Sequence, residues 1–185
     1  EIVKPEKIIP ATVEIVDIAG LVKGASKGEG LGNKFLANIR ETDAIIHVLR
    51  CFDNDNITHV DGSVDPVRDK EIIDIELQLK DLESLNNRME KVKRTAKSGD
   101  KEAIHEKEIL QKAIEFIESS NNIRSIELDT LEIDKYLKPL QLITSKPVLY
   151  VCNVDENCIN STNHYVESVK SLISKEGANL IVLAA

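Results

Sequence analysis

The chain has 185 residues, of which 30% are charged and only 3% are aromatic, so its core must be aliphatic. Its net charge of −8 argues against a protein that coats nucleic acid through bulk charge, although a local basic patch is compatible with that value. No apolar run is long enough to span a membrane, and the three cysteines lack metal-ligand spacing. These features favour a cytoplasmic protein with reduced thiols.

The first third of the chain alternates between strand-like and helical sequence. β-branched residues over 12–18 predict a buried strand that ends near Asp17. A glycine-rich stretch follows, and residues 33–42 then indicate a helix. The apolar residues over 44–50 predict a second strand, and the Asp- and Asn-rich segment 51–66 predicts a loop that ends at Pro66.

From Val67 onward the hydrophobic period becomes helical. Apolar residues recur three and four positions apart as far as Ala96, which predicts one long helix. Ser98-Gly99-Asp100 interrupts the pattern, and a second helix is predicted from there to about Ser119. Two long helices joined by a tight glycine turn predict an antiparallel coiled-coil hairpin.

The remaining sequence returns to the alternating pattern. We predict a loop over 120–130, a helix over about 130–143, a strand over 147–152, a helix over 162–176 and a strand over 179–184. This alternation is typical of an α/β fold with a mostly parallel sheet, whose strands should be covered on both faces. We therefore expect residues 1–66 and 130–185 to form a nucleotide-binding domain interrupted by a helical insertion, residues 67–129.

Three predicted strand ends carry residues suited to ligand binding, which in open α/β sheets occurs at the carboxyl ends of the strands. The first is Asp17-Ile-Ala-Gly20. In P-loop GTPases, an Asp of this Asp-x-x-Gly pattern holds Mg²⁺, usually through a water, and the Gly N–H approaches the γ-phosphate. Taken alone, the pattern is equally compatible with a simple turn after a strand.

The second strand end is Asn153-Val154-Asp-Glu156, and the third is Ala184-Ala185. GTPases select guanine with Asn-Lys-x-Asp after a strand, where the Asp accepts hydrogen bonds from the base. Glu156 has the same offset but is one methylene longer, so selectivity for guanine should weaken. The alternative interpretation is an Asn that caps the strand, followed by a solvated acid.

The glycine-rich stretch is not a phosphate-binding loop. No Gly-x-x-x-x-Gly-Lys-[Ser/Thr] occurs in the 185 residues, and the dinucleotide-binding pattern Gly-x-Gly-x-x-Gly fails as well. A Rossmann dehydrogenase is therefore disfavoured. A flexible loop directly after Asp-x-x-Gly favours a conformational switch instead.

Residues 17–40, from Asp17-Ile-Ala-Gly through Gly28-Glu-Gly-Leu-Gly to Arg40, resemble the switch II signature of the YchF / Obg-like ATPase family. Further similar segments are 44–66, Lys97-Ser-Gly-Asp-Lys101 and Lys146-Pro-Val-Leu-Tyr-Val-Cys-Asn153. The resemblance covers essentially the whole chain. It implies a partial Ras-like P-loop nucleotide-binding domain with an inserted coiled-coil arm, Mg²⁺ with ATP (or GTP, less selectively) as cofactors, and association with ribosomes.

The resemblance also implies roles for individual residues. Leu21, which follows Asp-x-x-Gly, cannot orient water, and the loop histidine to which the family assigns this role matches His59. The other residues that the resemblance and the strand ends place at the nucleotide are Asp17 (through Mg²⁺), Gly20, Asn153, Val154, Glu156, Ala184 and Ala185.

The family pattern places a phosphate-binding loop and switch I before Glu1 and a TGS domain after Ala185. Phosphate affinity depends largely on the backbone N–H groups and the Lys of that loop. We therefore expect residues 1–185 alone to bind ATP weakly and to hydrolyse essentially none. We also expect one edge of the sheet to be unpaired.

The predicted hairpin tip concentrates positive charge in an otherwise acidic chain. A solvated coiled-coil face and a contact with ribosomal RNA are both compatible with this excess. The second interpretation allows an interaction module in which nucleotide is irrelevant. The residues concerned are Arg88, Lys91, Lys93, Arg94, Lys97 and Lys101.

Overall fold

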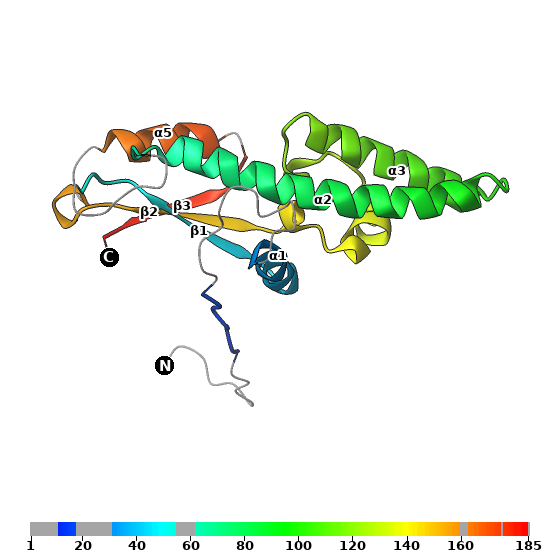
Figure 1. Ribbon diagram of the computed structural model, residues 1–185, viewed down its shortest axis with the longest axis horizontal. Coiled ribbons are helices and arrows are strands. Elements are labelled where there is room, and N and C mark those ends of the chain that lie inside the picture. Colours follow the sequence, from blue (N-terminus) through cyan, green and yellow to red (C-terminus); the bar gives the residue numbers. More distant parts are fainter. Residues whose placement is uncertain (1–10, 18–30, 55–61, 160–162, 175, 185) are drawn as a thin grey trace, which may run out of the picture.

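A computed structural model describes residues 11–17, 31–54, 62–159, 163–174 and 176–184, with the side chains of 31–35 left out. It shows a small parallel sheet and a long helical hairpin that projects from it (Figure 1). The helices are α1 (Leu31–Glu41), α2 (Pro66–Ala96), α3 (Lys101–Glu118), a short α4 (Thr130–Glu132) and α5 (His164–Ile173), and the strands are β1 (Ile45–Arg50), β2 (Val148–Asn153) and β3 (Asn179–Leu183). The predicted α/β class is confirmed.

The sheet has the order β1-β2-β3, and both pairs of strands are parallel. Its core lies on the face covered by α5 and the first turns of α2, where Leu49, Tyr150, Cys152 and Val169 are almost fully buried. On the opposite face, Ile46 and Val48 are 52% and 59% exposed. Val151, which is the register partner of Val48 and lies on this same face, is nevertheless 4% exposed. Among the described residues, the second face is therefore covered at β2 and open at β1, so the expectation that both faces are covered holds only in part.

The hairpin forms where the helical period predicted it. The Asp65 carboxylate caps α2 by accepting hydrogen bonds from the N–H groups of Val67 (3.1 Å) and Arg68 (3.0 Å), and Pro66 occupies the first turn. At the tip, Gly99 takes the left-handed conformation (φ 84°), which a residue without Cβ adopts at little cost. Asp100 then caps α3.

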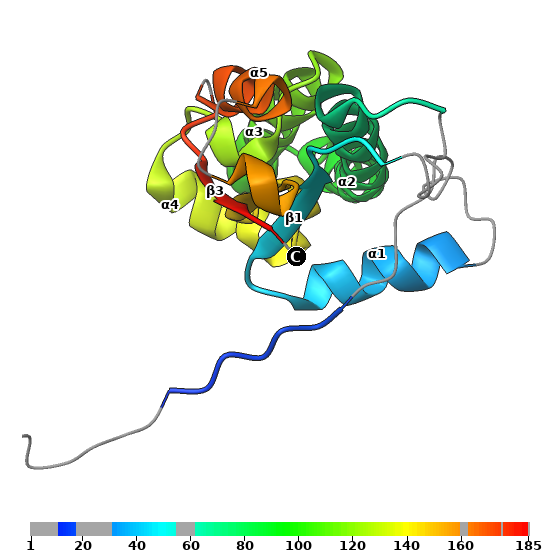
Figure 2. The same cartoon turned by 90° about the vertical axis from the view of Figure 1, so that its left-hand side faces the viewer.

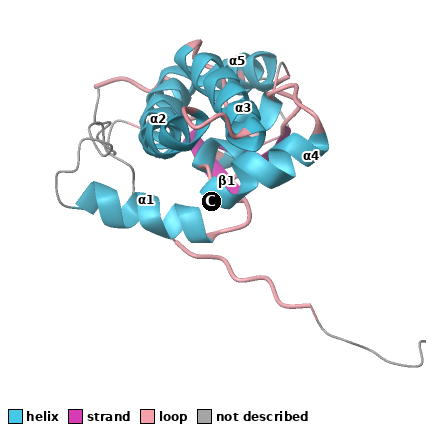
Figure 3. Ribbon diagram, turned by 90° about the vertical axis from the view of Figure 1, so that its right-hand side faces the viewer, coloured by secondary structure: helices cyan, strands magenta, loops and turns pink. Residues whose placement is uncertain are grey.

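The two helices share an aliphatic seam with the segment that follows them. Leu85, Met89 and Val92 of α2 and Ile109 and Leu110 of α3 are at most 4% exposed. The rest of this core comes from α3 and from residues 123–142: Ala103, Ala113, Ile114, Ile117, Ile123, Tyr136, Leu137 and Leu142. Viewed from the tip of the hairpin, α2, α3 and α5 lie on one side of β1, and α1 lies on the other (Figure 3).

Two predicted elements differ in the structure. Residues 11–17 form no strand and are exposed, with Val13 at 83% and Ile15 at 77%, and they lie apart from the sheet in both views (Figures 1 and 2). Their β-branched sequence favours extended backbone, but a strand also needs a neighbour, and no described strand pairs with them. The predicted helix over 130–143 is a series of short helical turns that ends before Gln141 (φ 48°), since Pro139 interrupts the helical hydrogen bonds.

Candidate nucleotide-binding edge

The carboxyl ends of the three strands lie in register at one edge of the sheet. Arg50 of β1 is paired with Asn153 of β2, which is paired with Leu183 of β3. The ladder continues for one more residue, because the N–H of Cys51 donates to the Asn153 carbonyl (2.7 Å) and the N–H of Val154 donates to the Leu183 carbonyl (2.9 Å). Two of the three predicted strand ends, at Asn153 and at Ala184, are thus brought side by side.

The loop after β2 contains one buried residue, Val154, and an exposed turn that carries Glu156. Val154 is 2% exposed and packs into the core beneath the edge, so it can meet a nucleotide only through its backbone. The Asp155 carboxylate accepts a hydrogen bond from the N–H of Asn157 (3.0 Å) and starts a short 3₁₀ turn over Glu156–Cys158. Glu156 is exposed on this turn, and its carboxylate is accessible at the edge of the sheet.

The loop after β1 is fastened at several points, which the sequence did not indicate. The Arg50 guanidinium donates to the Phe52 carbonyl (3.0 Å) and lies 4.8 Å from the Phe52 ring centroid. From α5, the Tyr165 hydroxyl donates to the Asp53 carboxylate (2.9 Å), and the Asn163 amide donates to the Cys51 carbonyl (2.8 Å). The hydrogen bond to Asp53 raises the pKa of Tyr165.

The buried groups beneath this edge have shifted pKa values. The Cys51 thiol lies against that of Cys152, and this hydrogen bond, together with burial, raises the pKa of Cys51. Both cysteines are free and fully buried, so they pack as small hydrophobic residues. His47 packs against the Tyr150 ring, with ring centroids 5.6 Å apart, and burial lowers the pKa of His47 to about 4.

The first predicted strand end is not brought to this edge. Asp17 lies in the exposed segment 11–17, and Gly20, His59 and Ala185 lie outside the described residues. A carboxylate suits Mg²⁺, which proteins commonly hold with one or two carboxylates and substrate phosphates. The described residues nevertheless contain no group of three or more His, Cys, Asp or Glu side chains arranged to hold a metal.

The six predicted cations of the hairpin tip are all exposed, but two of them are paired. The Arg88 guanidinium makes two hydrogen bonds to the Glu106 carboxylate, at 2.6 and 3.0 Å. Lys93 pairs with the exposed Glu90 at 2.8 Å. The other four are exposed, and the structure gives them no ion-pair partner among the residues it describes: Lys91, Arg94, Lys97 and Lys101.

Comparison with known proteins identifies the family. Residues 3–154 match the family model described as 50S ribosome-binding GTPase. The chain belongs to this family. The whole chain is 50% identical to the ribosome-binding ATPase YchF of Haemophilus influenzae and 50% identical to that of Bacillus subtilis, and it covers 50% and 51% of those proteins. It therefore spans about half the length of these relatives.

A solved structure agrees with the fold. The YchF GTPase of Schizosaccharomyces pombe matches 97% of the chain and half of its own, with a TM-score of 0.79 and 36% identity. The resemblance to the YchF / Obg-like ATPase family is thereby confirmed. Among the described residues, no helix of this family member is both long and apolar enough to cross a membrane. The division into a nucleotide-binding domain and an insertion over 67–129 stays a prediction.

Proposed function

We propose that the chain is the base-selecting and arm-bearing part of a nucleotide hydrolase that binds ribosomes and prefers ATP to GTP. The observation that carries this proposal is the alignment of Asn153 and Leu183 at the carboxyl edge of the sheet, with Glu156 exposed beside them. Ligands of open α/β sheets bind at this edge. The names of the relatives, which describe ribosome-binding ATPases, support the same activity.

Base selection depends on the carboxylate of Glu156. A Glu at this position crowds the 2-amino group of guanine, whereas an Asp leaves room for it. In the full-length protein, Glu156→Asp should raise the affinity for GTP relative to ATP about tenfold, which is the effect of one methylene in a fitted site. The control is Glu167→Asp on α5, which is also an exposed Glu. An unchanged ratio of dissociation constants, measured by calorimetry, contradicts the assignment.

Hydrolysis is proposed to depend on His59, which orients the attacking water, with Mg²⁺ and the nucleotide phosphates held by Asp17 and Gly20. His59→Ala should slow hydrolysis and leave nucleotide affinity unchanged, and His164→Ala on α5 is the control. Full activity of His59→Ala would remove His59 from the mechanism. Residues 1–185 alone should bind ATP weakly, because their sequence contains no Gly-x-x-x-x-Gly-Lys-[Ser/Thr].

A second candidate function rests on the tip. Its four exposed and unpaired cations fit the phosphates of ribosomal RNA, and a ribosomal partner places the protein in the cytoplasm. Ribosome co-sedimentation should weaken when Arg94 and Lys97 are reversed to Glu, whereas reversal of Lys107 and Lys112, which are exposed farther along α3, should have little effect. Ribosome binding that responds only to the bound nucleotide would contradict a nucleotide-independent role for the tip.

A further inference from the structure

One face of α2 near the sheet carries a polar stripe that the hydrophobic pattern does not reveal. Lys70, Asp74, Gln78 and Asp81 are spaced four, four and three residues apart, so they lie on one side of the helix. All four are buried or half-buried, and Asp81 is fully inaccessible. Since burial of charge is costly without partners, each of these groups must be matched by a group on another element.

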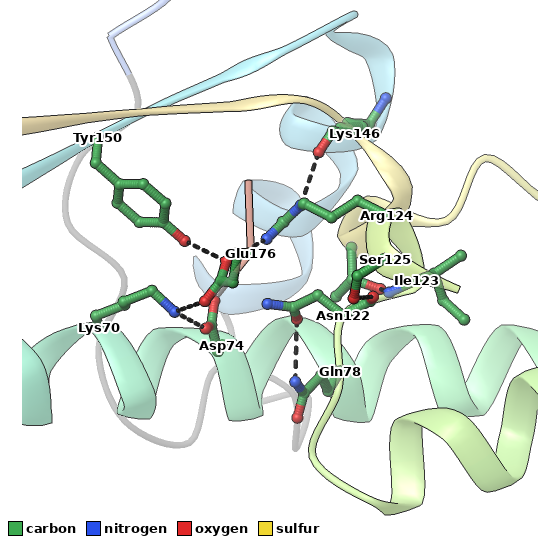
Figure 4. A network of polar contacts seen from close by, with 11 residues as sticks. Lys70, Asp74, Gln78, Asn122, Ile123, Arg124, Ser125, Lys146, Tyr150 and Glu176 are labelled. Atoms are coloured by element: carbon green, nitrogen blue, oxygen red, sulfur yellow. Dashed lines mark hydrogen bonds and ion pairs between the residues drawn. The ribbon is translucent and has the colours of Figure 1, made fainter. Parts of the chain in front are cut away.

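The first contact fastens α2 to the sheet (Figure 4). Lys70 is 2% exposed, and its Nζ lies 2.6 Å from the carboxylates of both Asp74 and Glu176. Glu176, which lies just before β3, also accepts a hydrogen bond from the Tyr150 hydroxyl of β2 (3.2 Å) and pairs with Arg124 (3.4 Å). We call this group the Lys70 clamp.

The second contact fastens α2 to the segment that enters β2. The Asp81 carboxylate accepts hydrogen bonds from the N–H groups of Ile143 (2.8 Å) and Thr144 (2.7 Å) and from the Thr144 hydroxyl (2.7 Å). One turn earlier, the Gln78 amide donates to the Asn122 side chain (3.0 Å). We call the contacts of Asp81 the Asp81 clamp.

The two clamps hold the starting ends of the strands that deliver the proposed base-binding groups. β2 (Val148–Asn153) begins shortly after Thr144 of the Asp81 clamp, and β3 (Asn179–Leu183) begins shortly after Glu176 of the Lys70 clamp. The same helix continues without a break to the basic tip at Lys97. One continuous helix therefore connects the tip to the contacts that precede both strands of the candidate site.

We propose that Lys70 and Asp81 are positioning residues that couple the hairpin tip to the nucleotide-binding edge, so that a partner at the tip changes nucleotide affinity. The proposal rests on the proposed function of that edge. Close-packed polar contacts of this kind are either made or broken rather than gradually deformed, which is the condition for a two-state response. Coupling of this type is reciprocal, because nucleotide must change the affinity for the partner by the same factor.

The test measures this factor in the full-length protein. The dissociation constant of a fluorescent, non-hydrolysable ATP analogue is determined with and without saturating ribosomes. In the wild type, ribosomes should change this dissociation constant by a factor within about 5–150. In Lys70→Met the factor should be close to one, while the dissociation constant without ribosomes changes less than about threefold. Lys70→Arg, which keeps the charge, should restore part of it. Lys80→Met, which removes a surface pair with Glu83 on the same helix, is the matched control.

The outcomes separate the two proposals. If the wild type does not bind the analogue at all, the proposed function fails. If it binds the analogue and ribosomes but neither changes the affinity for the other, only the coupling fails. The coupling proposal also fails if Lys70→Met shows the same coupling factor as the wild type. Should that variant not fold, Tyr150→Phe decides instead, because it removes one hydroxyl from the clamp and should lower the factor, whereas an unchanged factor contradicts the proposal.

Discussion

The two ends of α2 are built on different physical principles. Near the sheet, between Lys70 and Asp81, the helix is held by buried polar groups whose partners are fixed. Beyond Leu85 it is held chiefly by an aliphatic seam with α3, to which the Arg88–Glu106 pair adds, and its other charges face solvent. A polar contact is directional and specifies one geometry, whereas a hydrophobic contact depends chiefly on the area removed from water. The arm is thus fixed in orientation at its base and available for a partner at its tip.

The largest expected effect comes from the buried carboxylate at the base. Asp81→Ala leaves two backbone N–H groups and one hydroxyl without their acceptor, and each such buried group costs about 1–3 kcal/mol. We expect the free energy of unfolding to fall by about 3–5 kcal/mol in urea titrations. Asp134→Ala, which removes an exposed pair with Lys138, should change it by less than about 0.5 kcal/mol. Equal effects of the two substitutions would contradict the role of the Asp81 clamp.

A substitution that leaves a cavity tests how much the aliphatic seam between α2 and α3 contributes to stability. Leu110 of α3 is fully buried, so Leu110→Ala should lower the free energy of unfolding by about 3 kcal/mol, within the usual range for a buried Leu. Ile104 lies on the same helix and is 41% exposed, and Ile104→Ala should cost less than about 1 kcal/mol. Thermal unfolding followed by circular dichroism measures both variants. A small effect at Leu110 would mean that the hairpin does not unfold together with the sheet.

The free energy of unfolding should depend on pH because His47, near the Lys70 clamp, is buried. The pKa of His47 is lowered to about 4, chiefly by burial; the cations Lys70 and Arg124 contribute to this shift, and the carboxylates of Asp74 and Glu176 oppose it. In the unfolded chain a histidine titrates near about 6.5, so between these values the unfolded state takes up a proton that the folded state does not. Stability contributed by neutral His47 is therefore present above about pH 6.5 and is lost as the pH falls toward 4.

Between pH 7.5 and pH 5 this difference amounts to about 2 kcal/mol in the free energy of unfolding. Urea titrations at the two pH values measure it. His47→Phe should reduce the pH dependence by about that amount, whereas His164→Phe on the exposed face of α5 should leave it unchanged. A wild-type pH profile in His47→Phe would assign the dependence to other groups.

The sequence predicts an element best where a single contribution, the burial of aliphatic side chains, decides its structure. The helical period placed α2 and α3, and the apolar runs placed the three strands, because burial of aliphatic side chains decides those elements. The polar stripe of α2 was missed because Lys70, Asp74 and Asp81 have the composition of a solvated face, and their partners are as many as 106 residues away. Contacts between distant residues leave no periodic signal in a single sequence.

The candidate site shows the same limit. Asn153 and Glu156 were predicted from their position after a strand, and the structure brings Asn153 to the edge beside β3. The burial of Val154 and the fastening of the β1 loop by Tyr165 depend on packing across the sheet, which the motif does not encode. Local β preference predicts a strand over 12–18, but the described part of this segment, residues 12–17, pairs with no described strand.

The smallest expected effect lies at the tip and separates a structural cation from one available for binding. Arg88 holds Glu106 with two hydrogen bonds, so Arg88→Met should lower the free energy of unfolding by about 1 kcal/mol, less at high salt. Lys91 is exposed and has no ion-pair partner among the described residues, so Lys91→Met should not change stability measurably. Ribosome affinity should follow the opposite order, because only Lys91 keeps its charge free for a phosphate. If Arg88→Met weakens ribosome binding more than Lys91→Met without loss of stability, Arg88 leaves Glu106 on binding, and the tip rearranges rather than docking as a preformed surface.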